Sequence, residues 1–592
     1  MCSAAAVAQR TVTGTVVSAA DNEPVIGATV LPLPAGSAQG TSTDIDGRFS
    51  LTVPQNCHTL QVSYVGMATQ KVNIPADGKV KVSLVSEDTR LDDVIVVAYG
   101  TTKRSEYTGS ASVVKADQIE NTLTTTVTSA LNGKVAGVQL QSSNGAPGEA
   151  PAIRVRGMGS INASANPLIV LDGMPFDGTI ADIAPNDIES MTVLKDAAST
   201  ALFGARGANG VIMITTKRGG SGEAKVTVDM RWGANDRAIP NYNVLTSANM
   251  YNELVYEAFY NQYTSQGYSQ DVAWRNAANK ALTSSGYQIY TLPEGEYLVG
   301  RNGKINPNAQ LGYSDGTYYY TPDDWTENSM RNGFRQEYNV SVSGGTDKLK
   351  YYLSGSYLEN EGIVKASGFN RLNTRATVDY QAKKWLKLGT SMSYTYSKSD
   401  MPSDNDLDYA TSSGNIFYLA NQIAPIYPMF VRGADGNVMI DPLYNYPVYD
   451  YGDGLSTPNS RTFMTMANPV GNLFYNTTEY LTDVFDGKWY LTLTPVDGLS
   501  ITGNAGYYLS NLRYHGLDNP FYGQGAEGGG SAYQIDERSR SINLQAIANY
   551  TKTFNDVHNI DLMVGYETFN YEVENVSAIG YNLYRHDGWD VD

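Results

Sequence analysis

The chain has 592 residues and a net charge of −18, with 43 tyrosines and 57 glycines but only 17% charged residues. Nucleic acids and anionic membrane surfaces call for a basic patch, so this composition argues against them as partners. No apolar run reaches the length of about 18 residues that indicates a transmembrane helix, although a transmembrane β-barrel would leave no such run because its apolar residues alternate.

The first eight residues are expected to be the end of a secretory signal peptide. Ala6-Val7-Ala8 has the small-x-small form of a cleavage site, and small apolar residues precede it. Met1 would then lie inside a longer signal; the alternative is a flexible alanine-rich start. Cleavage after Ala8 removes Cys2 and leaves Cys57 without a partner, so we expect no disulfide within the chain.

Residues 9–87 predict a small antiparallel β-sandwich. Apolar residues alternate with polar ones in short runs such as Phe49, Leu51 and Val53, and turn signals separate the runs. One of these turns, residues 44–47, contains two aspartates and could be a calcium loop. No glutamate closes it as an EF-hand requires, so we interpret it as a tight turn.

The segment 88–100 contains a strongly apolar strand where a linker is expected. Its residues are Leu91, Asp92, Asp93, Val94, Ile95, Val96, Val97, Ala98 and Tyr99. Unpaired edges of this kind invite aggregation and are normally avoided. Two interpretations remain open: an edge strand of the sandwich, or a strand kept free for another protein, with the two aspartates maintaining its solubility.

Residues 101–220 predict a mixed α/β domain, with short helices near residues 127–131 and 196–203. Strands are expected at residues 152–157, 167–171, 187–194 and 210–216.

Residues 221–592 predict the first part of an outer-membrane β-barrel. Apolar and polar residues alternate over strand-length runs, and we count about nine strands. Turns near residues 344–348, 381–385, 495–498 and 555–559 are short, whereas the connections 236–333, 400–483 and 511–536 are long. Short turns on one side and long loops on the other are typical of such barrels.

We predict no enzymatic activity and no catalytic, metal or cofactor site. None of the four histidines stands in an H-E-x-x-H motif. Gly312 to Gly316 fits G-x-S-x-G, but a nucleophile elbow requires a buried strand before the serine and a helix after it. The flanking residues are polar and tyrosine-rich, so we interpret this match as chance.

The chain resembles the SusC/RagA family of TonB-dependent transporters. Residues 131–218, with IRVRGMGSINASANPLIVLDGMPFDG and LKDAASTALFGARGANGVI, are similar to the family's plug domain. Residues 10–86 resemble its carboxypeptidase-regulatory-like domain, and EYNVSVSGGTDKLKYYLSGSYLENEGIVKASGFNRLNTRATVDY resembles its early barrel strands. Such a barrel has about 22 strands, so the resemblance implies that this one is incomplete, either because the chain is a fragment or because the gene is broken.

The resemblance also implies a function: active import of a nutrient across the outer membrane, with the sandwich in the periplasm. Residues 91–99 stand where the TonB box stands and would bind TonB by adding a strand to its sheet. A SusD-like surface lipoprotein would cover the long loops, and outer-membrane lipid would surround the barrel. The expected substrate is an oligosaccharide, with a peptide as the alternative. A surface adhesin or structural barrel without transport is the alternative from another class.

Within the plug, three arginines are expected to be buried against carboxylates of the plug or barrel wall: Arg154, Arg156 and Arg206. Buried ion pairs could hold the plug yet let it rearrange. The alternative is that these arginines lie on a solvated surface. Asp172 and Gly173 follow a buried strand and are expected to form a turn with a structural or gating role.

Overall fold

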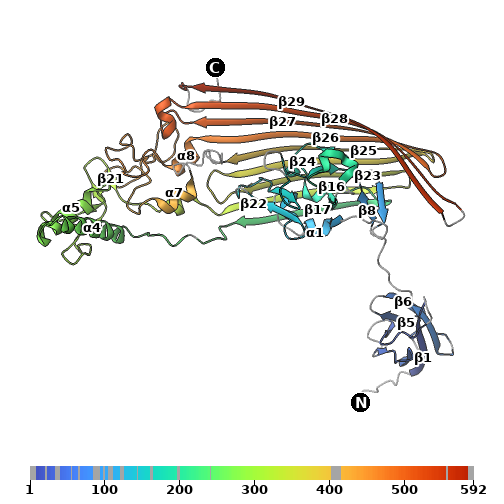
Figure 1. The fold of residues 1–592 in the computed structure, drawn as a ribbon. Helices are drawn as coiled ribbons and strands as arrows, with labels where there is room; N and C mark the ends of the chain where they lie inside the picture. Colours follow the sequence, from blue (N-terminus) through green and yellow to red (C-terminus); the bar gives the residue numbers. More distant parts are fainter. Residues whose placement is uncertain are drawn as a thin grey trace, which may run out of the picture. The chain divides into compact units, whose positions relative to one another are not determined.

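The computed structural model divides into two compact units, residues 1–95 with 101–108 and residues 96–100 with 109–592 (Figure 1). The residues that the structure describes are 9–19, 23–33, 40–54, 57–64, 67–75, 77–84, 94–97, 100–103, 111–120, 126–142, 145–159, 164–196, 200–240, 242–401, 415–554 and 558–584. The predicted signal remnant lies outside them.

The first unit is a β-sandwich, as predicted. One sheet has the order β4-β1-β7 and the other β3-β2-β5-β6. The first sheet contains β1 (Gln9–Ser18), β4 (Arg48–Pro54) and β7 (Lys79–Leu84), and the second contains β2 (Thr29–Leu33), β3 (Thr41–Ser42), β5 (Thr59–Tyr64) and β6 (Met67–Asn73). The pairing of β1 with β7 is parallel, which the sequence did not predict.

Alternation along these strands creates the core of the sandwich. In β4, Phe49, Leu51 and Val53 are buried while their neighbours are exposed. Cys57 is also buried as a free thiol. The acidic turn is a tight turn, since the Asp44 carboxylate accepts from the backbone N–H groups of Asp46 and Arg48 at 3.0 and 2.8 Å.

Only residues 94–97 of the predicted free strand are described. They form β8 (Val94–Val97), which pairs with β9 (Gly100–Lys103) in a two-stranded sheet. Among the described residues, neither sheet of the sandwich includes β8, so the sandwich-edge interpretation is not supported. Within the part of the chain that the structure describes, β9 is the one strand paired with β8, and a strand with a single partner has a second edge to which another strand can add.

The plug is built on a five-stranded sheet with the order β10-β15-β16-β13-β14. Its strands are β10 (Ala111–Lys115), β13 (Leu168–Leu171), β14 (Met174–Phe176), β15 (Ile188–Leu194) and β16 (Val211–Thr216), and β11 (Val138–Gln141) pairs separately with β12 (Ala152–Val155). Short helices surround it: α1 (Ala116–Glu120), α2 (Val127–Ala130), η1 (Ile180–Asp182), η2 (Pro185–Asp187) and η3 (Ala201–Gly207).

The remainder of the second unit is dominated by one antiparallel sheet. Nine strands pair in chain order within the described residues, and Figure 1 shows them side by side as a single wall. They are β17 (Gly222–Asn235), β22 (Gly333–Gly345), β23 (Leu349–Glu361), β24 (Gly368–Lys383), β25 (Leu386–Met401), β26 (Thr477–Val496), β27 (Leu499–Asp518), β28 (Ser531–Phe554) and β29 (His558–Tyr581). The mainly-β fold class is confirmed.

The two faces of this wall have opposite chemistry. Along β24, Arg371, Asn373 and Arg375 are buried, whereas Leu372 between them is 46% exposed. A soluble sheet buries its apolar face. Here the polar face is covered by the plug and the apolar face is left open, as on a wall in contact with lipid.

No helix among the described residues combines the length and apolar character needed to cross a membrane.

All connections at one end of the wall are short, and the three long ones lie at the other end together with the six-residue connection 362–367. Residues 346–348, 384–385, 497–498 and 555–557 connect strands at one end, and residues 236–332, 402–476 and 519–530 connect them at the other. The long connections contain α4 (Ala248–Ser265), α5 (Gln270–Thr283), α6 (Trp325–Ser329), α7 (Ile416–Gln422) and α8 (Pro469–Tyr475), which gather at that end in Figure 1.

These long connections share a tyrosine-rich core of their own. Tyr475 stacks on Tyr522 with ring centroids 4.5 Å apart, and Tyr287 meets Tyr427 edge-on at 5.5 Å. Such pairs stabilise packing beyond the area they bury. We call this assembly of residues 242–332, 415–476 and 519–530 the loop cap.

Asp450 gives the loop cap an expected pH dependence. Its carboxylate accepts from the Tyr287 hydroxyl at 2.9 Å and the Gly452 N–H at 2.7 Å. Burial raises the pKa of Asp450 to about 6, although Arg461 opposes this. A carboxyl with a raised folded pKa stabilises most below its unfolded pKa, and this stabilisation is lost as the pH rises through 6.

Lowering the pH from 7.5 to 5 is therefore expected to stabilise the cap by about 1 kcal/mol. Hydrogen exchange of the amides around Asp450, corrected for intrinsic rates, measures this change. Asp450→Asn should remove the pH dependence of the cap's stability. An unchanged pH dependence in that variant would mean that another group titrates.

Candidate functional site

The buried charges between the plug and the wall form the candidate site. We define the plug–wall cluster as Asp172 and Asp187 of the plug with Arg375 and Lys488 of the wall. Asp172 and Gly173 form the turn between β13 and β14, with positive φ angles of 49° and 84°. Asp-Gly suits a tight hairpin because two consecutive positive φ angles are required there.

The Asp172 carboxylate is fixed by the neighbouring strand of the plug. It accepts from the Thr216 backbone N–H at 2.9 Å and from the Thr216 hydroxyl at 2.7 Å. The wall contributes a third donor, the Ser391 hydroxyl at 3.2 Å. These donors hold the carboxylate against the inner face of the wall.

Arg375 of β24 lies between both plug carboxylates. Its guanidinium nitrogens are 3.8 Å from an oxygen of Asp172 and 3.8 Å from an oxygen of Asp187. These distances exceed hydrogen-bond length, so the contacts are charge pairs. The Arg375 side chain is 2% exposed, and it donates to the Ser391 hydroxyl at 3.0 Å.

The electrostatics keep Asp172 ionised at neutral pH. Burial alone would raise its pKa, but Arg375, Arg218 and the two Thr216 donors outweigh burial, and the pKa of Asp172 is lowered. The plug thus carries a buried negative charge whose principal counter-charge belongs to the wall. Lys488 of β26 also donates to the Asp172 carbonyl oxygen.

Asp187 ends helix η2 and makes a second connection to the wall. Its carboxylate accepts from the Tyr352 hydroxyl at 3.0 Å and from the Ser354 hydroxyl. Nearby, Arg371 donates to the Ala181 carbonyl at 2.9 Å, and Thr395 donates to the Asp182 carbonyl at 2.9 Å. The plug is therefore held to the wall through several polar groups, and it also makes apolar contacts, such as Phe176 of the plug against Tyr508 of the wall.

The predicted plug residues divide into two groups. Asp172 and Gly173 lie at the centre of the plug–wall cluster. The burial expected of the arginines is wrong for Arg156 and Arg206, which are exposed. Ile153 and Val155 of β12 are buried in the plug core. Arg154 and Arg156 alternate with them along the chain and point away from the core.

The three arginines also differ in their partners. Arg154 is half-buried and donates to the Asn166 side-chain oxygen at 2.6 Å, with no carboxylate involved. Arg206 does face a carboxylate of the wall, because it pairs with Glu567 of β29 at 2.8 Å. The Arg206 guanidinium also lies 4.6 Å from the centroid of the Phe569 ring.

Three members of the plug–wall cluster were not predicted from the sequence as site residues: Asp187, Arg375 and Lys488. A signal for Arg375 was present, because charged residues recur on the polar face of β24 at positions 371 and 375. Charges on the inner face of a membrane wall need partners inside the barrel, and the plug is the element that fills it.

Ser314 of the G-x-S-x-G match has the wrong local structure for a nucleophile elbow. It lies in β20 (Tyr313–Ser314), which pairs with β21 (Tyr319–Tyr320). The Asp315 carboxylate accepts from the Thr317 and Tyr318 N–H groups, both at 2.8 Å. Ser314 therefore stands in a hairpin where an elbow requires a strand followed by a helix.

Comparison with known proteins agrees with this architecture. The TonB-dependent receptor plug domain family matches residues 103–211, and the carboxypeptidase-regulatory-like domain family matches residues 12–97. A plug seated on the polar face of an antiparallel membrane wall, with this domain before it, defines a TonB-dependent receptor.

Individual relatives are similar in sequence to much of this chain, and a solved structure is similar to it in fold. TonB-dependent receptor P3 of Formosa agariphila is 30% identical over 562 residues, covering 94% of this chain and 48% of that protein. TonB-dependent receptor SusC of Bacteroides thetaiotaomicron is 32% identical over 372 residues, covering 61% of this chain and 31% of SusC. The RagAB peptide importer in its open-open state matches with a TM-score of 0.65 and 23% identity, over 82% of this chain and 50% of that one.

The chain belongs to the SusC/RagA family of TonB-dependent receptors, which are outer-membrane proteins. It spans about half the length of the curated relatives that it matches most extensively, 48% in two cases.

Proposed function

We propose that the protein imports a nutrient actively across the outer membrane and that residues 91–99 couple it to TonB. The observation that carries this proposal is the plug held in the wall by exchangeable polar contacts, with β8 just before it in the chain. A passive barrel needs neither a plug nor a handle. The N-terminal sandwich and β8 would face the periplasm, where TonB acts.

The coupling follows from strand chemistry. A strand added to a partner's sheet is held by several backbone hydrogen bonds at once, so it can bear a pull along the chain. The plug is released one polar contact at a time, because each buried charge can exchange its partner for water entering the barrel. Pulling on β8 would thus open a path along the wall.

The proposed substrate is an oligosaccharide. Aromatic side chains remain exposed on the loop cap, among them Tyr446, Phe463 and Phe521. Flat apolar ring faces suit the stacking of sugar rings, and the tyrosine also offers a hydroxyl group. A peptide is the second candidate, because the structurally similar RagAB complex is described as a peptide importer.

A SusD-like surface lipoprotein is the proposed partner, seated over the loop cap. Binding residues are carried disproportionately by the segments that connect the elements of a rigid scaffold, and residues 236–332 and 402–476 are long connections of this kind. The lipoprotein would close over a substrate bound among the loops.

A single preparation tests both substrate and partner. The protein, produced from its complete gene, is purified in mild detergent, and binding and cellular uptake of oligosaccharide and peptide panels are measured. We expect one lipoprotein to co-purify and one oligosaccharide class to be bound and imported. Uptake of peptides alone would favour the second candidate, and binding without uptake would favour a surface adhesin.

A further inference from the structure

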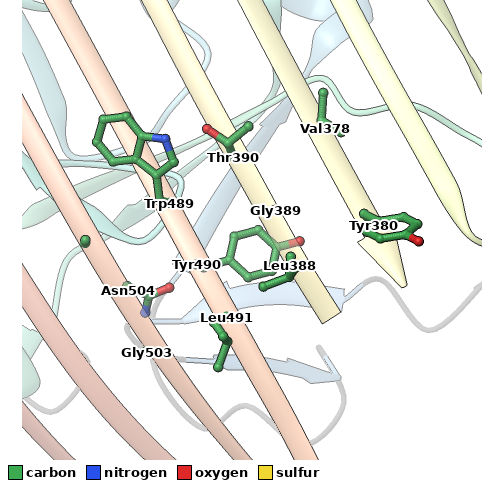
Figure 2. Close-up of a pocket in the computed structure, with 11 residues that line it drawn as sticks. Val378, Tyr380, Leu388, Gly389, Thr390, Trp489, Tyr490, Leu491, Gly503 and Asn504 are labelled. Atoms are coloured by element: carbon green, nitrogen blue, oxygen red, sulfur yellow. The ribbon is translucent and has the colours of Figure 1, made fainter. Parts of the chain in front are cut away.

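A groove lies on the outside of the wall, away from the plug. It has a volume of about 600 Å³ and crosses the central strands β24 to β27. Figure 2 shows its lining side chains in two rows, with Trp489 and Val378 in one and Leu491, Leu388 and Tyr380 in the other. All strands that flank these four are present in the sheet, so the groove is not a product of the sheet edges.

Strand alternation places most of the groove lining on the outer face of the wall. Ser391, Lys488 and Gly506 contact the plug or would meet it, since a Cβ at Gly506 would lie 2.7 Å from Met174. Most of the residues that line the groove have the opposite parity on the same strands, including Thr390 and Trp489, and Gly389, Tyr490 and Asn504 are the exceptions. The groove therefore opens towards lipid and is separated from the import path by the wall.

The groove is apolar and has a floor of small residues. Gly503 and Ala505 of β27 leave a depression beside Trp489 and Leu491, each of which is 40% exposed. A Cβ built at Gly503 would meet no atom within 4 Å, so the space above it is open. A flexible hydrocarbon chain can follow such a depression, whereas a sheet or helix needs a flat or ridged surface.

Two lysines lie beyond one end of the groove, at the level where the head group of a bound lipid would lie. The groove ends near Tyr380, and β24 ends three residues later at Lys383, about 10 Å further along the strand. Lys383, Lys384 and Trp385 are exposed at this turn. The turn is held in place because the Thr494 N–H donates to the Trp385 carbonyl at 2.9 Å.

This basic turn contrasts with the acidic chain, whose net charge is −18. The two neighbouring turns contain Asp497 on one side and Asp347 with Lys348 on the other, all exposed, so three lysines outweigh two carboxylates locally. An exposed tryptophan beside lysines is typical of the level at which phospholipid head groups begin.

We propose that this groove binds one acyl chain of an anionic glycerophospholipid, with its phosphate at Lys383 and Lys384. The short-turn end of the wall faces the periplasm in the proposed function, so the lipid belongs to the periplasmic leaflet; this assignment of the leaflet rests on that function. The binding itself does not, because it is measured on the purified protein without TonB or substrate.

Native mass spectrometry tests the acyl-chain part. The protein from its complete gene, delipidated in detergent, is titrated with phosphatidylglycerol or with phosphatidylcholine of the same acyl chains. Gly503→Leu adds a side chain to the groove floor at a position where a built Cβ meets no atom within 4 Å. Loss of contact with about two methylene groups should weaken the binding of both lipids roughly tenfold.

Gly355→Leu is the matched control, since Gly355 is another outward glycine of the wall whose added Cβ meets nothing within 4 Å. It should bind lipid like the parent. Equal binding by Gly503→Leu and Gly355→Leu would overturn the proposal. A parent that retains no lipid but loses a dimer on Gly503→Leu would also overturn it, because a second copy would then occupy the groove.

The head-group part has its own pair of variants. Lys384→Glu should reduce the preference for phosphatidylglycerol over phosphatidylcholine by roughly tenfold while leaving phosphatidylcholine binding unchanged. Lys348→Glu reverses an exposed lysine in the neighbouring β22–β23 turn and should change neither. An equal loss of preference in both variants would contradict a specific head-group site.

Discussion

Arg375→Ala is expected to loosen the plug and make the outer membrane permeable to compounds that it normally excludes. The substitution removes the cation that faces both Asp172 and Asp187, and Asp172 is ionised at neutral pH because its pKa is lowered. Breaking a buried ion pair on one side costs about 3–5 kcal/mol, since the remaining charge stays buried. Sensitivity to a large antibiotic and hydrogen exchange in the turn at Asp172 measure the two effects.

The control is an exposed ion pair on the outer face of the same wall, away from the plug. Arg513 lies 3.6 Å from Asp483, and its side chain is 47% exposed. Arg513→Ala should cost less than about 1 kcal/mol and leave permeability unchanged. If Arg375→Ala were as mild as Arg513→Ala, the plug would be held by something other than the plug–wall cluster.

Much of the fold was predictable because the strands of membrane walls and of sandwiches both alternate apolar and polar residues, one kind on each face. The strands near residues 386–397 and 542–550 were read correctly from that period, and the short turns and long loops followed. The loop cap was not predicted. Its tyrosines have no period, because they pack between connections distant in sequence, as Tyr287 does with Tyr427.

The plug–wall cluster was predicted only in part. Asp172 and Gly173 stood out because an Asp-Gly pair after a buried strand indicates a tight turn. Arg375 did not stand out. Polar residues on one face of a strand are compatible with a solvent-exposed face as well as with a buried polar one, and the sequence does not say what covers that face. The error on Arg156 has the opposite cause: its apolar neighbours Ile153 and Val155 occupy the core and leave the arginine outside.

Val96→Pro is expected to abolish uptake. Proline removes the backbone N–H of residue 96 and fixes φ, which an interior ladder position tolerates poorly. Val96 lies within β8, so the change falls inside the strand that we propose TonB binds. Val96→Thr retains both the N–H and a β-branched side chain and should import at nearly the parent rate.

The most direct test of the account is uptake measured beside surface binding for these two variants, produced from the complete gene and compared at equal amounts in the outer membrane. We predict that Val96→Pro binds the identified substrate like the parent but imports none, while Val96→Thr does both. Import by Val96→Pro at the parent rate would contradict the account, because the strand at residues 91–99 would then not be the coupling handle.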